Sequence, residues 1–302
     1  MSRIVNMLPR TPARRYVVAA AHHASLWLTR CFPKLFPLVC VVGYPKSGTT
    51  WAAQLVADYF DLPLPRRPML PLGFPAVIHG HEPVRPGYRH CVYVMRDGRD
   101  TLVSQYFALM RRVSDDRMNP TIPRNLRPYI PPIRDKEDVT TNLFAMIERQ
   151  MTRPISTRLN WGRHVLSYLE AGRDDVALLR YEQLLADGAD HLAQAVAVLA
   201  GEAADEEKAQ LAIDRFAFAR RARGRAPGEE DRNSSMRKGQ AGDWRNHFTR
   251  EIAELFDRHA GEALVAAGYE PDRTWVQSVP TTPPARAVGA GVLAEADDAD
   301  DD

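Results

Sequence analysis

A short loop that combines two glycines, a lysine and several hydroxyl side chains separates an apolar run from a helical pattern. It runs from Gly43 to Thr50 in the order Gly-Tyr-Pro-Lys-Ser-Gly-Thr-Thr. Backbone amides in such a loop, together with the positive end of the following helix, bind phosphate. A nucleoside-triphosphate loop has its lysine directly after the second glycine. Here Thr49 takes that position and the lysine is Lys46, which predicts a phosphate site of another kind.

A second group of polar residues follows the apolar run Cys91–Met95. Arg96 comes directly after this run, and Ser104 lies eight residues later in a helical pattern. An arginine fork binds two phosphate oxygens at once, and a serine one to two turns into a helix adds a hydroxyl donor. The pair is therefore a candidate for a second phosphate. For Arg99 and Asp100 we expect a structural or exposed ion pair instead.

Histidine is the side chain best suited to accept a proton near neutral pH, and the chain contains nine. His79, His81 and Glu82 follow a short apolar segment and are the candidates for a general base. Five further histidines are expected to be structural, exposed or engaged in local hydrogen bonds: His22, His23, His164, His247 and His259.

The pattern of apolar residues predicts how these groups are positioned. Buried, β-branched runs alternate with helical patterns, which is typical of an α/β fold with a central parallel sheet flanked by helices. The strands are expected at 38–42, 76–79, 91–95 and 176–181. After the loop, further helices are expected at 101–112, 138–149, 153–171, 190–200 and 250–267.

The chain of 302 residues is expected to form one domain, residues 38–270, with a basic helical lead-in (1–37) and a disordered acidic tail (271–302). The net charge of +2 includes six acids in the last eight residues, so the body is more basic than the total and favours anionic ligands. Three cysteines do not make a disulfide scaffold and fit a reducing, cytoplasmic compartment.

The apolar stretch Tyr16–Leu28 is interrupted by two histidines and is shorter than the roughly 20 residues that a membrane-spanning helix needs. We expect a short helix packed on the domain. The alternative is a helix lying in a membrane interface, with Arg14 and Arg15 at its edge.

The string YPKSGTTW, residues 44–51, resembles the 5′-phosphosulfate loop of sulfotransferases that use 3′-phosphoadenosine 5′-phosphosulfate (PAPS), of the cytosolic and bacterial type. The resemblance implies that the lysine contacts the oxygen bridging sulfate and phosphate, that the loop holds the 5′-phosphate, and that the tryptophan stacks on adenine. The residues concerned are Lys46, Ser47, Gly48, Thr49, Thr50 and Trp51.

Two later segments are also similar to this family. Residues 93–104 resemble its 3′-phosphate motif, which assigns Arg96 and Ser104 to that phosphate. Residues 237–248 resemble its RKGxxGDWxNHF segment, which also serves the 3′-phosphate. This second likeness adds Arg237, Lys238 and Gly239.

Two aromatic residues have both a family role and an ordinary one. Tyr181 resembles the tyrosine that hydrogen-bonds the adenine edge, with a core tyrosine as the alternative. Phe218 is a candidate for the aromatic side chain against adenine, with a helix core position as the alternative.

The segment Ile78–Pro83 resembles the family's strand end, where a histidine is the catalytic base, and this position is His81. Many cytosolic relatives have a lysine two residues earlier, where this chain has His79. His79 and Glu82 remain the alternatives for the base.

The resemblance predicts a PAPS-dependent sulfotransferase that needs no metal. It would move the sulfuryl group in line to a hydroxyl or amine of a small-molecule, lipid or carbohydrate acceptor. The alternative is a P-loop kinase that uses ATP. A third class, a nucleic-acid or anion-binding protein, would rest on the arginines between 220 and 225, but no interleaved aromatics accompany them and we expect no nucleic-acid partner.

Some cytosolic relatives dimerise through a K-x-x-x-T-V-x-x-x-E segment. Arg245, Thr249 and Glu254 fit it here, but Arg250 replaces the valine. A charge in place of a small apolar contact opposes burial, so we expect a monomer or a weak homodimer.

Overall fold

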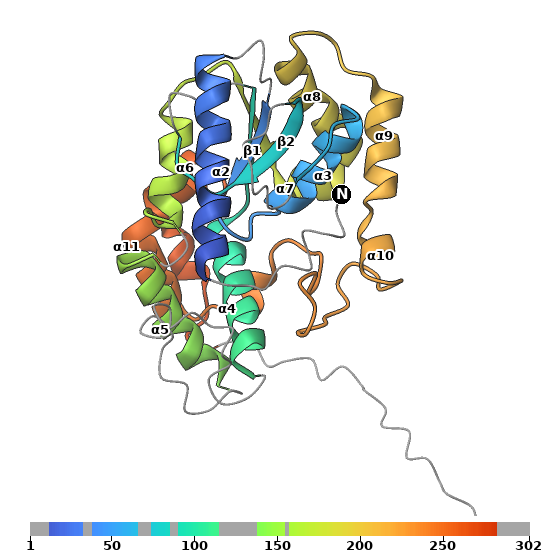
Figure 1. Ribbon diagram of the computed structural model, residues 1–302. Coiled ribbons are helices and arrows are strands. Elements are labelled where there is room, and N and C mark those ends of the chain that lie inside the picture. Colours follow the sequence, from blue (N-terminus) through green and yellow to red (C-terminus); the bar gives the residue numbers. More distant parts are fainter. Residues whose placement is uncertain are drawn as a thin grey trace, which may run out of the picture.

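The computed structural model describes residues 12–32, 38–65, 74–84, 90–114, 138–154 and 157–282. Its centre is a parallel sheet with the strand order β2-β1-β3-β4, and helices surround this sheet (Figure 1). The bounds are β1 Leu38–Gly43, β2 Ala76–Gly80, β3 Cys91–Met95 and β4 Val176–Arg180. The expected α/β fold with a central parallel sheet is confirmed, and each of these strands lies within about one residue of its predicted range.

Both faces of the sheet are covered by helices, because alternate residues of each strand point to opposite sides. Val41, Val92 and Leu179 pack on one face, whereas Val42 and Tyr93 pack on the other. The first face carries α3 (Thr49–Tyr59), α8 (Gly188–Ala200) and α9 (Glu206–Arg215). The second carries α4 (Gly98–Ser114), α5 (Val139–Thr152), α6 (Trp161–Leu169) and α11 (Arg250–Ala266).

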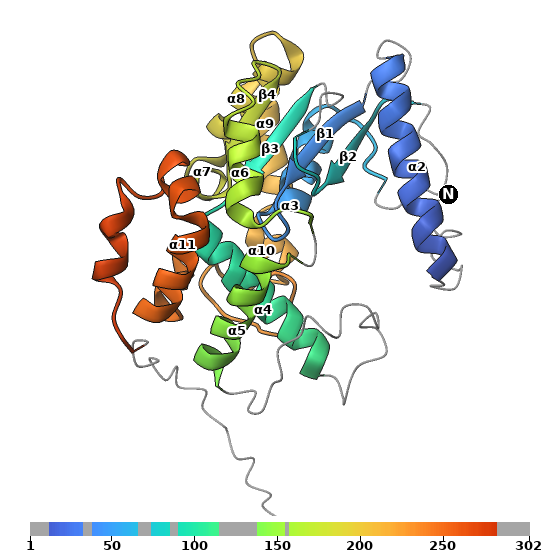
Figure 2. The ribbon, with the colours of Figure 1, turned by 90° about the vertical axis from the view of Figure 1, so that its left-hand side faces the viewer.

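The remaining elements are short or lie outside these layers. Helix α2 (Pro12–Cys31) runs beside the edge strand β2 (Figure 2). The other short elements are α7 (Tyr181–Ala186), α10 (Phe218–Arg221), and the 3₁₀ helices η2 (Asp243–Asn246) and η3 (Arg273–Ser278). None of the helices in the ranges that the structure describes is long and apolar enough to cross a membrane.

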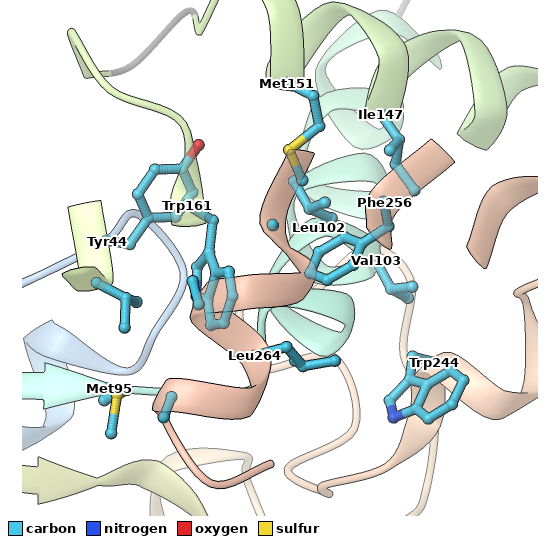
Figure 3. Close-up of a cluster of buried hydrophobic side chains, with 14 of the residues drawn as sticks. Tyr44, Met95, Leu102, Val103, Ile147, Met151, Trp161, Trp244, Phe256 and Leu264 are labelled. Carbon is cyan, nitrogen blue, oxygen red and sulfur yellow. The ribbon is translucent and has the colours of Figure 1, made fainter. Parts of the chain in front are cut away.

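The larger core lies between the second face and its helices, and Figure 3 shows Trp161 and Phe256 at its centre. Trp161 is fully buried, and its indole N–H donates to the Arg96 carbonyl at 3.1 Å. A Cβ at Gly98 would lie 2.5 Å from the Trp161 ring. This close packing positions the turn between β3 and α4, which carries Arg96.

Two expected boundaries are wrong. The helix expected at 153–171 begins at Trp161, because Asn160 caps it by accepting a hydrogen bond from the Arg163 amide at 3.0 Å. The expected disordered tail begins too early: η3 is ordered, and Trp275 and Val279 are buried against the core. Residues 283–302 lie outside the described ranges. Helices α7 and α9 were not expected from the sequence.

Candidate active site

The candidate site lies where β1 and β3 end. These neighbouring strands are parallel, so their carboxyl ends meet at one edge of the sheet. The helices that follow them, α3 and α4, pack on opposite faces of the sheet, so the two connections diverge at this edge. Open α/β sheets bind their ligands at such a switch point.

The phosphate loop, residues 43–50, is tightly folded after β1. Gly48 has a φ of +89°, and a Cβ there would lie 2.6 Å from the Tyr181 ring. Lys46 adopts a φ of +78°, a left-handed conformation that costs free energy in a residue other than glycine. Gln105 Nε2 donates to the Pro45 carbonyl at 2.9 Å and thereby holds this conformation from α4. Sequence reasoning missed Gln105.

The loop has the features that a phosphate requires. Within the described part of the chain, the Ser47 Oγ and Thr49 Oγ1 atoms are buried and have no hydrogen-bond partner. The first amides of α3 have no acceptor within the helix. Buried hydroxyls without partners are costly in a protein alone, and a phosphate at the start of α3 would satisfy both. The residues present therefore fit the 5′-phosphate group.

Arg96 joins three parts of the site. Its guanidinium lies 4.3 Å from the centroid of the Tyr181 ring, and it donates to the carbonyls of Lys46 at 3.4 Å and Gln240 at 3.2 Å. Trp51 packs edge-on against Tyr181, with ring centroids 5.9 Å apart. Tyr181 is thus buried, as the core interpretation expected, and it also lines the predicted nucleotide site.

Asp100 ties the RKG segment, residues 237–248, to α4. Its carboxylate accepts hydrogen bonds from the amides of Gly242 at 2.7 Å and Trp244 at 2.8 Å. Its closest cation is Arg96, at 3.8 Å, and burial raises the pKa of Asp100. The structural role expected for Asp100 is confirmed, although its partner is not Arg99.

Arg99 has a separate structural role. Its guanidinium is buried and pairs with Asp97 at 2.7 Å and with Glu270 at 2.5 Å. It lies between the rings of Trp244 and Trp275, at 3.9 and 4.6 Å from their centroids. Arg99 therefore holds the C-terminal elements on α4.

The cations of the RKG segment converge on one carboxylate. Arg237 pairs with Asp243 and Glu230, and Lys238 Nζ lies 2.5 Å from Asp243 Oδ1. Burial would raise the pKa of Asp243, but His247, Arg237 and Lys238 hold it well below its usual range. The local hydrogen-bonding role expected for His247 is confirmed.

Two other predicted residues lie near this segment. Gly239 packs so closely on the Phe218 ring that no Cβ would fit there. Ser104 lies one turn after Asp100 on α4 and is partly exposed; residues four apart share a helix face, so it belongs to the face that meets the RKG segment.

His81 is joined directly to the phosphate loop. Its Nδ1 lies 2.7 Å from the Gly43 carbonyl. A carbonyl oxygen only accepts, so Nδ1 carries the proton and Nε2 keeps a lone pair. The His81 residue is only partly exposed, and its partial burial lowers the pKa of the imidazole from 6.5. At neutral pH His81 is therefore a neutral proton acceptor.

His164 supports the segment that carries His81. It is fully buried, and its Nε2 donates to the His81 carbonyl at 3.2 Å while its Nδ1 accepts from the Tyr93 hydroxyl at 3.0 Å. Burial lowers the pKa of His164 to about 4. Tyr168 stacks on Tyr93 and donates to the Glu82 carbonyl at 3.0 Å. A structural role is among those expected for His164 from the sequence, and its helical spacing with Tyr168 is a signal that could have indicated this support.

The two alternative bases are placed differently. The Glu82 carboxylate lies 3.2 Å from His22 Nε2 on α2. Burial would raise the pKa of Glu82, but His22 outweighs it and lowers the value to about 2, which makes Glu82 a weak base. The His79 ring is edge-on to His81, with centroids 6.4 Å apart. In the described ranges, no group of three or more His, Cys, Asp or Glu side chains is placed to hold a metal ion.

Known proteins share both the sequence pattern and the fold. The sulfotransferase domain family matches residues 89–268. Cytosolic sulfotransferase 3 of Arabidopsis thaliana is 23% identical over 261 residues, 75% of this chain and 76% of that protein. The 3-alpha-hydroxysteroid sulfotransferase of Cavia porcellus is 25% identical over 267 residues, which cover 76% and 84%.

Two solved structures have the same fold. Mouse sulfotransferase SULT7A1, complexed with PAP, has a TM-score of 0.53 and 22% identity over 77% of this chain and 89% of its own. Retinol dehydratase, in complex with androsterone and the inactive cofactor PAP, has a TM-score of 0.55 and 18% identity over 84% and 94%. The family match covers more than half of the chain and includes the two later motifs, residues 93–104 and 237–248, so the chain belongs to the sulfotransferase domain family.

Proposed function

We propose that the protein transfers the sulfuryl group of PAPS to a hydroxyl or amine of a small-molecule acceptor, with His81 as the base. The observation that carries this proposal is the 2.7 Å hydrogen bond from His81 Nδ1 to the carbonyl of Gly43. It joins a neutral proton acceptor to the first residue of a phosphate loop. An acceptor hydroxyl can then lie between the base and the donor group.

On the donor side, PAPS supplies a sulfuryl group attached to a phosphate that leaves. Ser47 and Thr49 offer buried hydroxyls without partners, and the resemblance assigns Lys46 to the charge that develops on the bridging oxygen. The resemblance assigns the 3′-phosphate to Arg96, Ser104 and the RKG segment. Two solved relatives are complexed with PAP, which supports PAPS as the donor here.

On the acceptor side, His81 Nε2 takes the proton of the attacking hydroxyl. The ring keeps its orientation because Nδ1 stays bonded to Gly43. The positive charge that forms on His81 is stabilised by the neighbouring Glu82 carboxylate. His164 is a positioning residue that holds the His81 backbone and does not titrate near neutral pH.

The acceptor class follows from the relatives and the loops. One relative is named for a 3-alpha-hydroxysteroid, and another structure holds androsterone, which supports a small apolar alcohol. The lipid and carbohydrate classes are further candidates. From the sequence, the acceptor site is expected to be shaped by 63–75, 113–136 and parts of 138–165. The first two segments fall largely outside the described residues, whereas 138–154 and 157–165 are described. Cytosolic relatives and the three free cysteines support a cytoplasmic location.

The test is a comparison of two labelled donors. The protein is incubated with an alcohol and phenol panel and either ³⁵S-labelled PAPS or γ-³²P-labelled ATP. Transfer of ³⁵S alone is expected, and transfer of ³²P alone would favour the kinase.

Calorimetry with 3′,5′-ADP gives a second readout. Arg96→Ala should cost about 2–3 kcal/mol of affinity, whereas the exposed Arg215→Ala should cost none.

A further inference from the structure

Helix α2 buries its small residues. Ala21, Ser25 and Thr29 occur four residues apart and are 4%, 0% and 3% exposed. The Ser25 hydroxyl donates to the Ala21 carbonyl at 2.7 Å and the Thr29 hydroxyl to the Ser25 carbonyl at 3.1 Å. These bonds within the helix satisfy the buried hydroxyls, so the polar face can pack on the protein.

The opposite face of α2 is apolar and exposed. Tyr16 is 78% exposed, Trp27 59% and Phe32 46%, and Trp27 and Phe32 touch edge to face with centroids 6.4 Å apart. Residues 16, 20, 23, 27 and 31 follow a helical spacing, and each is exposed. A helix on a protein in water normally buries such aromatic side chains, and α2 has the reverse arrangement.

The position of α2 leaves this face uncovered by the sheet and its helices. Figure 2 shows α2 at the outer edge of the sheet, beside β2. The His22 Nε2 atom lies 3.2 Å from a Glu82 carboxylate oxygen, and this contact joins the other side of α2 to the residues that follow β2. The helix is therefore attached to the body by one face and presents the aromatic face outward.

The charge around α2 indicates what the aromatic face meets. Residues 1–37 contain six arginines and lysines and no acidic residue. A second copy of the chain would bring two basic segments together, which opposes association. Tyrosine and tryptophan beside cations are typical of a helix that lies in the headgroup region of an anionic membrane.

We propose that α2 docks the protein on anionic membrane surfaces, with Tyr16, Trp27 and Phe32 inserted between the headgroups. The net positive charge of the sequence 1–37 attracts the chain to such a surface. This inference goes beyond sulfotransfer and does not depend on it. The docking face is separate from the phosphate loop and from His81, so lipid binding can be tested without measuring activity.

The first experiment is co-sedimentation of the full chain with vesicles of phosphatidylcholine alone or mixed equally with phosphatidylglycerol. Binding should be about tenfold tighter or more with the anionic lipid and should weaken with salt. Trp27→Ser should weaken it about tenfold. Leu211→Ser on α9, where the leucine is 47% exposed, is the matched control and should bind normally. Equal, salt-independent binding to both vesicles would overturn the charge argument.

The second experiment uses the cysteines. Cys31 is exposed on α2, whereas Cys40 and Cys91 are buried, so a polarity-sensitive dye can label Cys31 selectively. Its emission should shift to the blue on anionic vesicles. A dye on Leu211→Cys in a Cys31→Ser background should not shift. A dimer that Trp27→Ser dissociates, with no vesicle binding, would overturn the proposal in favour of a second copy; no change at all would overturn it outright.

Discussion

At the scale of single residues, proton placement separates the three candidate bases. The Glu82 carboxylate contacts His22, which lowers the pKa of Glu82 to about 2. His81 donates through Nδ1 to Gly43 and retains the Nε2 lone pair. The resemblance selected His81, and the hydrogen bond supplies an independent physical reason for the same residue.

Replacing Lys46 and replacing His81 should impair the reaction in different ways. Lys46→Ala should lower kcat about 10²–10³-fold, as for loss of an oxyanion donor, and weaken donor binding. His81→Ala should remove about 10²–10⁴ of the rate and leave 3′,5′-ADP affinity nearly unchanged. Steady-state kinetics and calorimetry measure both. If His81→Ala stays active on an alkyl alcohol while His79→Ala is inactive, the base is misassigned.

The pH dependence of the rate should report the lowered pKa of His81. The base works only when deprotonated, and its deprotonated fraction rises with pH. Because burial lowers the pKa of His81 from 6.5, kcat/KM should rise with pH to a plateau, with a midpoint below 6.5. The residual activity of His81→Ala should lack this limb. A midpoint above 6.5 in the unmodified enzyme would contradict the assignment.

At the scale of elements, the site depends on contacts between segments that are distant in sequence. Asp100 holds the RKG segment through two amides, and Gln105 holds the phosphate loop. Both lie on α4, which itself packs through Gly98 against Trp161. Helix α4 is thus the element that aligns the two phosphate-binding regions.

Replacing Asp100 should loosen this alignment. Asp100→Ala leaves the buried amides of Gly242 and Trp244 without an acceptor and removes a partner of Arg96. We expect a loss of about 2–4 kcal/mol in the free energy of unfolding, measured with urea, together with weaker 3′,5′-ADP binding. The exposed pair of Asp58 and Arg215 is the control, and Asp58→Ala should cost less than about 1 kcal/mol. Equal costs would contradict the proposed role.

At the scale of the whole molecule, the segment that resembles a dimerisation motif, residues 245–254, makes contacts within its own chain. Arg250 donates from its side chain to the carbonyls of Gln277 at 2.8 Å and Val279 at 3.2 Å, and from its amide to Pro280 at 2.7 Å. Thr249 caps α11. Backbone carbonyls at the end of η3 and just after it therefore accept hydrogen bonds from Arg250 in this segment.

We predict a monomer in solution. Sedimentation velocity without lipid should give one species near the chain mass of 34.0 kDa over a wide concentration range, because Arg250 is engaged within its own chain. Arg250→Val would restore the relatives' residue and provides a comparison. A stable dimer that Glu254→Ala alone dissociates would show that the relatives' interface operates here.

The sequence by itself determined the features that depend on neighbouring residues. The phosphate loop, the parallel strands and the three motifs are local patterns of glycine, charge and apolar spacing, so they could be predicted with their positions. The start of α6 was predicted wrongly because the helical pattern was extended past Asn160, which caps the helix. The predicted end of the folded body was also wrong, because Trp275 packs against Trp244 and Phe256, which are distant in the sequence.

Only the tertiary structure decided which residues support the site. The contacts of His81 with Gly43, Gln105 with Pro45 and His164 with the His81 carbonyl join residues that no sequence periodicity relates. The pKa values that separate the candidate bases also depend on burial and on charges brought in by other elements, such as His22 on α2. The type and spacing of residues are local properties of the sequence. The burial of a side chain and its hydrogen-bond or charge partners arise only when distant segments pack together.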